Sequence, residues 1–240
     1  MYLVLVINVI FSGRLGDPAK TAGVGLGTTM NHIFGCCILF GLNRAMDTLI
    51  SHAYGAGNLA LCGVYLNRAR IIGTIAFIPV TFICMNCEVV LLWFSQDPKT
   101  VEFAAKYTRQ MIPALYFMNL CDQQAKFLTF MQCPNLVLMA QFITTTVHAP
   151  LCYFFVVVCD LDVVGLSYAS LVSFSCEFVS LLIFTNCKSS IREALTMPYT
   201  LAFKDWGSYL DLALPAVLNS CSDWWAFEIL IFVSGYVGVT

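Results

Sequence analysis

The sequence predicts an all-α, polytopic membrane helix bundle with about six full spans and a partial first one. Of its 240 residues, 59% are hydrophobic and only 11% are charged, and the mean hydropathy is +0.80. A typical soluble domain is roughly 45–50% apolar and about 25% charged. A water-soluble fold of this size could not cover so much apolar surface, which argues against a soluble enzyme. Long charge-free stretches, residues 21–43 and 127–159, support the same class.

The apolar stretches set the positions of the spans. A helix needs about 20 mostly apolar residues to cross the hydrocarbon core. We expect spans at 20–43, 68–94, 102–131, 135–159, 163–187 and 207–238. The stretch 127–159 is too long for one span, and Cys133-Pro134-Asn135 divides it. Residues 1–12 are too short to cross and are expected to be the end of a span that begins earlier.

Charges in the connections predict the orientation of the bundle. Basic residues favour the cytoplasmic side, which places the segments 44–67 and 188–205 there. Within the third span, Asp122 and Lys126 are four residues apart, so we expect them to pair on one helix face. Arg44 and Asp47 have a similar spacing and are also close enough to pair.

Several classes of protein have no support in the sequence. The net charge is −2 and neither sign forms blocks, which argues against a nucleic-acid partner. The 12 cysteines are scattered, and the CxxC at Cys84–Cys87 has no second pair at zinc spacing. No nucleophile–base pair or phosphate-binding loop is present. We therefore predict no catalytic residues, no metal site and no cofactor.

Two acids in the last apolar helix are the main candidates for chemistry. Asp223 and Glu228 interrupt the span 207–238, where an ionised carboxylate costs on the order of 2.5–3.5 kcal/mol. Such a group faces the bundle interior or a wet cavity, or keeps its proton. Trp224 and Trp225 beside it offer aromatic faces to organic cations. The alternative for each acid is a structural pairing with a neighbouring helix.

Other intramembrane residues carry weaker signals. Glu88 and Glu177 are single acids within spans and could line a cavity. Pro215 interrupts the hydrogen bonds of its helix, and a kink there could lie along a substrate path. The isolated histidines are interpreted as core or loop residues; they are His32, His52 and His148.

Two motifs resemble a known transporter family. Residues 41–57 read GLNRAMDTLISHAYGAG and resemble the G-L-x-S-A-L-D-T-L-x-x-Q-A-Y-G-A segment of eukaryotic MATE (multidrug and toxic compound extrusion) transporters. Residues 206–215, WGSYLDLALP, and 221–230, CSDWWAFEIL, resemble the seventh helix of that family. Shorter matches are found in order between them, at residues 126–128, 144–148 and 163–169. By this resemblance, the structural signature of the family comprises Asp47, Tyr54, Gly55 and Pro215.

The resemblance implies a fold of about twelve helices in two six-helix lobes. Residues 1–205 would form the first lobe, with an incomplete first helix, and 206–240 the opening helix of the second. It also implies an antiporter that exports organic cations or other small xenobiotics in exchange for protons, by alternating access. Sodium is a second candidate ion. Asp223 matches the position of a carboxylate implicated in coupling, with Glu228, Trp224 and Trp225 beside it.

The implied partners are membrane lipid, a small cationic organic substrate, and protons, with a monomeric full-length form. The implied location is multi-pass, in a plasma or vacuole-type membrane. Departures from the family pattern include His52 for glutamine, Asn43-Arg44 for small residues, a Phe127–Met131 segment without the family's two glutamines, and Asp223 for glutamate. Two alternatives are a truncated, transport-incompetent fragment and a seven-helix receptor. The receptor leaves the Asp-Trp-Trp and Ala-Tyr-Gly-Ala motifs unexplained.

Overall fold

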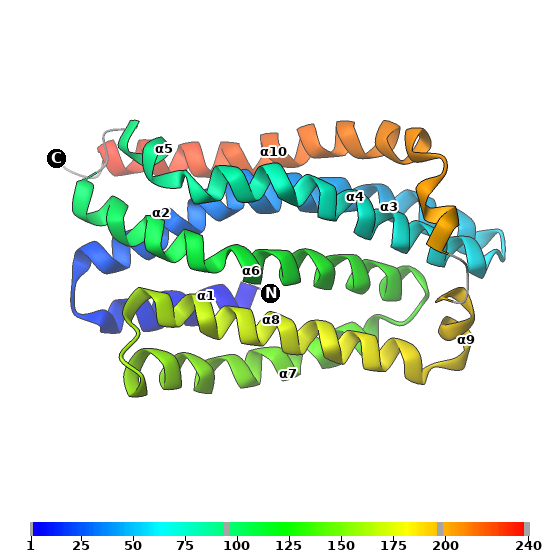
Figure 1. The fold of residues 1–240 in the computed structure, drawn as a ribbon, viewed down its shortest axis with the longest axis horizontal. Helices are drawn as coiled ribbons and strands as arrows, with labels where there is room; N and C mark the ends of the chain where they lie inside the picture. Colours follow the sequence, from blue (N-terminus) through cyan, green and yellow to red (C-terminus); the bar gives the residue numbers. More distant parts are fainter. Residues whose placement is uncertain (1, 94–96, 196–198, 238–240) are drawn as a thin grey trace.

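The computed structural model describes residues 2–93, 97–195 and 199–237, and within these it leaves out the side chains of residues 2, 190, 193, 199 and 227–237. These residues form an elongated bundle of long helices that lie roughly side by side (Figure 1). The helices are α1 Tyr2–Ser12, α2 Pro18–Asn31, α3 Cys37–Gly55, α4 Leu59–Met85, α5 Cys87–Trp93, α6 Pro98–Phe130, α7 Pro134–Cys152, α8 Asp162–Cys187, α9 Ser189–Arg192 and α10 Trp206–Val237. Two π-helical segments, His32–Cys36 and Tyr153–Val158, join α2 to α3 and extend α7. Short 3₁₀ turns complete the connections at Gly13–Leu15, Glu193–Leu195 and Tyr199–Phe203.

Each expected span corresponds to a helix, and two boundaries differ. Most of the segment 44–67, expected as a connection, is helical, because α3 runs to Gly55 and α4 begins at Leu59. The chain reverses in only three residues, where Gly57 adopts a φ of +73° and the Asn58 side chain caps α4 by accepting from the Leu61 amide. The span expected at 68–94 instead breaks at Asn86, between α4 and α5. The turn after α3 and the short α9 lie at the same end of the bundle (Figure 1).

The distribution of side chains is that of an integral, multi-pass membrane protein. Among the described residues, four helical segments are long and apolar enough to cross a membrane: Pro18–Gly55, Leu59–Met85, Pro134–Val158 and Asp162–Cys187. Large apolar side chains cover the outside; Phe82, Phe142 and Leu218 are 71%, 74% and 70% exposed. Asparagine, glutamine, serine and threonine side chains lie inside, where they bond to one another.

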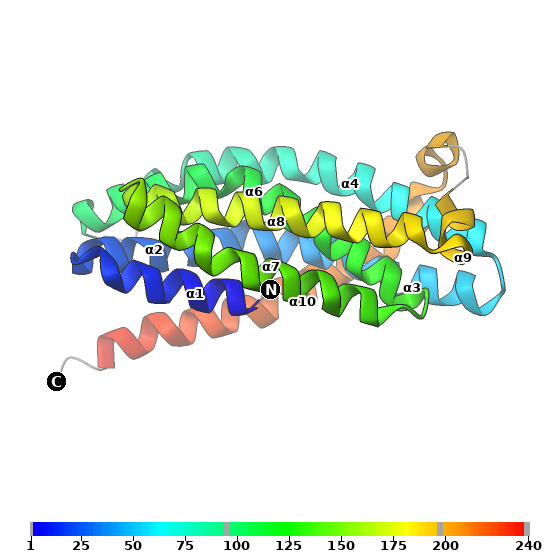
Figure 2. The ribbon, with the colours of Figure 1, turned by 90° about the horizontal axis from the view of Figure 1, so that it is seen from below.

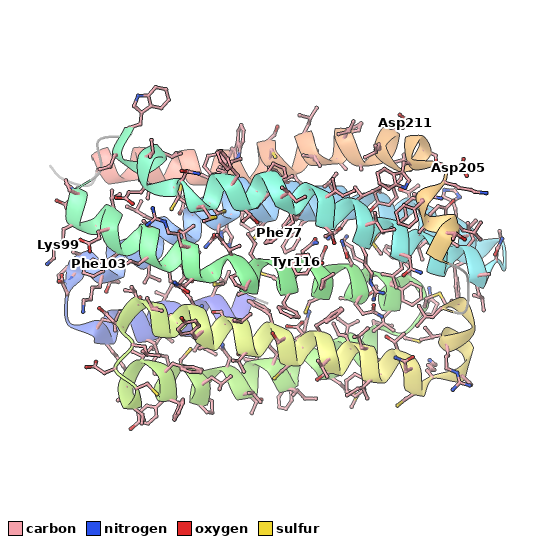
Figure 3. All side chains as sticks on the ribbon, viewed as in Figure 1. Phe77, Lys99, Phe103, Tyr116, Asp205 and Asp211 are labelled. Atoms are coloured by element: carbon pink, nitrogen blue, oxygen red, sulfur yellow. The ribbon has the colours of Figure 1, made fainter. Side chains whose placement is uncertain are left out.

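The charged helix α6 lies in the interior of this bundle. It packs against α2, α3, α4, α7 and α8, which explains how a 33-residue helix with several charges fits among apolar neighbours. Figure 3 shows Phe77 of α4 and Tyr116 of α6 near the middle of the bundle, and their ring centroids are 5.0 Å apart. The charges of α6 can therefore be satisfied by other helices instead of by water.

Helix α10 is held against α3 by a close backbone approach. A Cβ atom on Gly41 would lie 2.6 Å from the Cα atom of Val217, so only glycine fits at this crossing. At the next residue of α3, the Leu42 carbonyl accepts a hydrogen bond from the Tyr209 hydroxyl of α10 at 3.0 Å. Figure 2 shows α10 along the margin of the bundle, so its contact with α3 fixes its position.

Substituting Gly41 tests this contact. We expect Gly41→Ala to lower stability by about 1–3 kcal/mol, because the added methyl group overpacks the α3–α10 crossing. Thermal unfolding of the purified protein in detergent measures the change. Gly25→Ala is the matched control, since a Cβ atom there meets nothing within 4 Å. Equal melting temperatures for Gly41→Ala and Gly25→Ala would contradict the close approach.

Ion pairs tie the helices together at the end opposite α9. The Lys99 ammonium lies 2.8 Å from Asp17, and Lys20 lies 2.7 Å from Asp162. Asp17 also caps α2 by accepting from the Ala19 amide at 2.9 Å. The hydrogen bond from Lys99, followed by that from Ala19, lowers the pKa of Asp17 below its ordinary value.

The Asp17 contact predicts a pH dependence of stability. Because the pKa of Asp17 is lowered in the folded state, its ionised form contributes stability above the ordinary pKa of 3.8, and this is lost as the pH falls through the folded value. Asn also caps helices, so Asp17→Asn removes mainly the charge. We expect the melting temperature of wild type to exceed that of Asp17→Asn at neutral pH and to converge with it as the pH falls below the pKa of Asp17 in the folded state. A difference that stays constant with pH would show that the ion pair contributes nothing.

Candidate functional site

Three of the predicted site residues follow one another on α10. Asp223 is exposed, Trp225 is 47% exposed, and Trp224 is partly buried. The ring of Trp224 lies 5.0 Å from the ring of His32, at an interplanar angle of 51°. Trp224 therefore faces the α2–α3 junction, whereas Asp223 and Trp225 are exposed on either side of it, about 160° apart around α10. The side chain of Glu228 lies outside the described residues.

No pattern in the sequence predicts the contact of His32 with Trp224. His32 begins the π-helical segment His32–Cys36, where the wider turn displaces the side chains relative to a regular α-helix. The Cys37 thiol donates to the His32 carbonyl at 2.8 Å within this segment. Gly35 lets α6 approach closely, since a Cβ atom there would lie 2.6 Å from the Leu115 side chain. Such segments are frequent at functional sites, and this one presents His32 to α10.

A cluster of polar side chains joins α3 to α6, and we call it the α3–α6 polar layer. Its members are Asn43, Asp47, Asn119, Asp122, Gln123 and Lys126. Lys126 Nζ lies 2.7 and 2.9 Å from the two carboxylate oxygens of Asp47. Asn43 Nδ2 donates to Asp122 Oδ2 at 2.8 Å and to Asn119 Oδ1 at 2.9 Å. Gln123 Nε2 donates to Asn43 Oδ1 at 3.0 Å and to the Ala69 carbonyl at 3.1 Å.

This polar layer corrects two expected pairings. Lys126 bonds to Asp47 of the neighbouring helix and not to Asp122 on its own helix. Asp47 accordingly pairs with Lys126 and not with Arg44, whose side chain is exposed. Packing of α3 on α6 brings the Lys126 ammonium to both oxygens of Asp47. A partner four residues along the same helix offers a weaker contact.

The other residues of the family signature lie on α3 and α10. Tyr54 is partly buried and packs against the hydrophobic core of the bundle. Gly55 is the last residue of α3, immediately before the Ala56–Asn58 reversal. Pro215 lies within α10, between Tyr209 and the Asp-Trp-Trp motif.

A second buried cluster joins α1, α7 and α8 around His148. Its Nδ1 lies 2.8 Å from the Ser173 hydroxyl, and its Nε2 lies 3.0 Å from Asn8 Oδ1. The Ser170 hydroxyl donates to a backbone carbonyl, so it accepts from Asn8 Nδ2 at 3.0 Å. Asn8 Oδ1 therefore faces His148 as an acceptor, which places the imidazole proton on Nε2. The Cys152 thiol lies 3.3 Å from the same nitrogen.

The two remaining candidate acids have different surroundings. Glu177 lies on α8 and is 5% exposed, so it faces the bundle interior. Glu88 follows the α4–α5 break and lies 2.7 Å from Arg109 Nη2, with both side chains 44% exposed. Arg109 also donates to the Met85 carbonyl at the end of α4, so this pair fastens the break to α6. Within the described part of the chain, no group of three or more His, Cys, Asp or Glu side chains could hold a metal ion.

An all-helical bundle with an apolar exterior and a polar interior defines the chain as a multi-pass membrane protein. Residues 1–154 match the MatE family model, which is more than half of the chain. The chain therefore belongs to the MATE family.

Individual relatives agree with this assignment. The chain is 32% identical over 244 residues to human multidrug and toxin extrusion protein 1, covering 100% of this chain and 42% of that protein. It is 32% identical over 234 residues to Protein DETOXIFICATION 16 of Arabidopsis thaliana, covering 96% and 47%. The crystal structure of the eukaryotic MATE transporter AtDTX14 superposes with a TM-score of 0.91 at 24% identity, over 98% of this chain and 52% of that one, which shows the fold. The chain thus spans less than half the length of the human and the DETOXIFICATION 16 proteins.

A double-mutant cycle tests the pairing of Asp47 with Lys126. We expect Lys126→Gln to destabilise the protein because it leaves a partly buried carboxylate without its cation, and Asp47→Asn added to it to recover part of the loss. The coupling free energy should be about 0.5–1 kcal/mol, reduced by the partial exposure of the pair. Thermal unfolding of the four proteins provides the measurement. Additive effects of the two substitutions would show that the residues do not interact.

Proposed function

We propose that the full-length protein is a secondary active antiporter that exports organic cations or other small xenobiotics in exchange for protons, by alternating access. Residues 1–205 belong to its first lobe, and residues 206–240 open the second. The observation that carries this proposal is the grouping of three side chains on one turn of α10, where Trp224 contacts His32 and Asp223 and Trp225 are exposed on either side of it. The printed names of the relatives, which describe toxin extrusion and detoxification, support the class of substrate.

The chemistry of the proposed site follows from these side chains. The ionised carboxylate of Asp223 attracts an organic cation, and the exposed ring of Trp225 offers a cation–π contact of about 0.5–2 kcal/mol. A proton on the same carboxylate removes its charge and releases the cation. One acid that holds either a proton or a substrate links the two fluxes in opposite directions. The fully functional form is a monomer in this proposal, and sodium is the alternative coupling ion.

A second candidate concerns the 240-residue chain on its own. The side chains of Asp223 and Trp225 are both exposed, with no opposing surface among the described residues. A two-lobed cavity closes over its substrate from both sides, so the chain alone is expected to move no substrate. Export is therefore assigned to the full-length protein.

Transport measurements on proteoliposomes test the proposal. Full-length protein should move ethidium, a fluorescent organic cation, when a pH gradient is imposed, and Asp223→Asn should reduce this movement at least about tenfold. The loss is expected because asparagine cannot bind and release a proton. Asp211→Asn is the matched control, an exposed acid of the same helix near the end opposite Lys99 (Figure 3).

Three outcomes of this assay are informative. Unchanged pH-driven movement in Asp223→Asn rules out the proposed role of this acid. Movement driven by a sodium gradient and not by a pH gradient identifies sodium as the coupling ion. Movement by the isolated 240-residue chain would contradict the assignment of export to the full-length form.

A further inference from the structure

Asp122 is an acid in the bundle interior that no cation neutralises directly. The nearest lysine, Lys126, directs its ammonium at both oxygens of Asp47. Asp122 instead accepts a hydrogen bond from the neutral amide of Asn43, at 2.8 Å. None of the ion pairs formed by the described residues includes Asp122.

Charged and titratable groups on the surrounding helices are engaged elsewhere. Arg70 bonds to Gln124 at 2.7 Å and Arg68 lies over the ring of Tyr65 at 5.3 Å, whereas Arg44 of α3 is exposed and acts on Asp122 through its charge. The other titratable groups near Asp122 are the thiols of Cys36 and Cys121, the carboxyl groups of Asp47 and Glu177, and the hydroxyl of Tyr209. Two acids and one lysine thus share the α3–α6 polar layer, which leaves one carboxylate in excess.

The amides around Asp122 are buried and not fully used. Asn119 and Gln123 are 1% and 0% exposed, yet Asn119 Nδ2 and Gln123 Oε1 have no hydrogen-bond partner. Both side chains pack against α4 at Gly73. A Cβ atom on Gly73 would lie 2.6 Å from Gln123 Nε2 and 3.0 Å from Asn119 Nδ2. The cluster thus contains a free acceptor, which can satisfy a donor that is absent while Asp122 is ionised.

We infer that Asp122 is a proton-binding site of the first lobe, separate from Asp223, and that the Asn43 amide holds it. Uptake of a proton converts the carboxylate into a carboxylic acid, removing the excess negative charge and adding an O–H donor to a cluster that has a free acceptor. No bond to carbon is made or broken. Proton binding here does not depend on whether export is driven by protons.

The position of Asn43 gives this proton a structural consequence. The Asn43 side chain forms hydrogen bonds with three residues of α6: Asn119, Asp122 and Gln123. The two residues before it hold α10, since Gly41 lies against Val217 and the Leu42 carbonyl accepts from Tyr209. A change in the hydrogen bonds of Asn43 therefore acts on the segment of α3 that positions α10.

Infrared spectroscopy of full-length protein containing isotope-labelled aspartate tests the site directly. The Asp223→Asn background removes the aspartate to which the proposed function assigns a proton, so the result does not depend on that function. On acidification, we expect a C=O band of protonated aspartate that disappears in Asp122→Asn and persists in Asp211→Asn. Persistence of every band in Asp122→Asn overturns the inference.

Two further variants keep the test decisive if Asp122→Asn does not fold. Asn43→Ala removes the amide that holds the ionised carboxylate, so the band should appear at a proton concentration about tenfold lower. Asp47→Asn frees Lys126 to pair with Asp122, so the band should require a higher proton concentration. A band whose titration is the same in wild type, Asn43→Ala and Asp47→Asn overturns the inference.

Discussion

The structure depends on the rule that polar groups inside a membrane bundle find their partners in other helices, because the lipid supplies none. Helix α3 shows the consequence most clearly. On one side its Asn43 and Asp47 bond to α6, and on the other Gly41 and Leu42 receive α10. The two sets of contacts lie within seven residues of one another. The position of α10, and with it that of Asp223, is therefore set by the hydrogen bonds of α3.

The same rule separates two kinds of buried polar residue. His148 and Asn8 bond to each other and to their serine neighbours, so their cluster joins α1, α7 and α8. The α3–α6 polar layer is incomplete, because it contains an acid in excess and two amide atoms without partners. A complete network favours one arrangement, and an incomplete one has room for a proton and a second arrangement.

Much of the fold could be predicted from the sequence, since runs of apolar residues mark membrane spans wherever they occur. Contacts between helices could not. The expected pair of Asp122 and Lys126 was wrong because spacing along one helix is visible in a sequence, whereas the approach of Asp47, 79 residues away, is set by packing. The contact of His32 with Trp224 was missed for the same reason, and because the π-helical segment that turns His32 toward α10 has no recognised sequence signal. The candidate acids Asp223 and Glu177 were found because any acid in an apolar span is conspicuous.

The central claim is that contacts of α3 with both α6 and α10 hold α10 in place. The most direct test is the distance between spin labels carried by unnatural amino acids at Ser51 of α3 and Ser208 of α10, both of which are exposed. The purified 240-residue chain, to which no transport cycle is assigned, should give one narrow distance distribution, which broadens when Asn43 is replaced by alanine. A broad distribution in the wild type, or one that Asn43→Ala leaves unchanged, would contradict this role of α3.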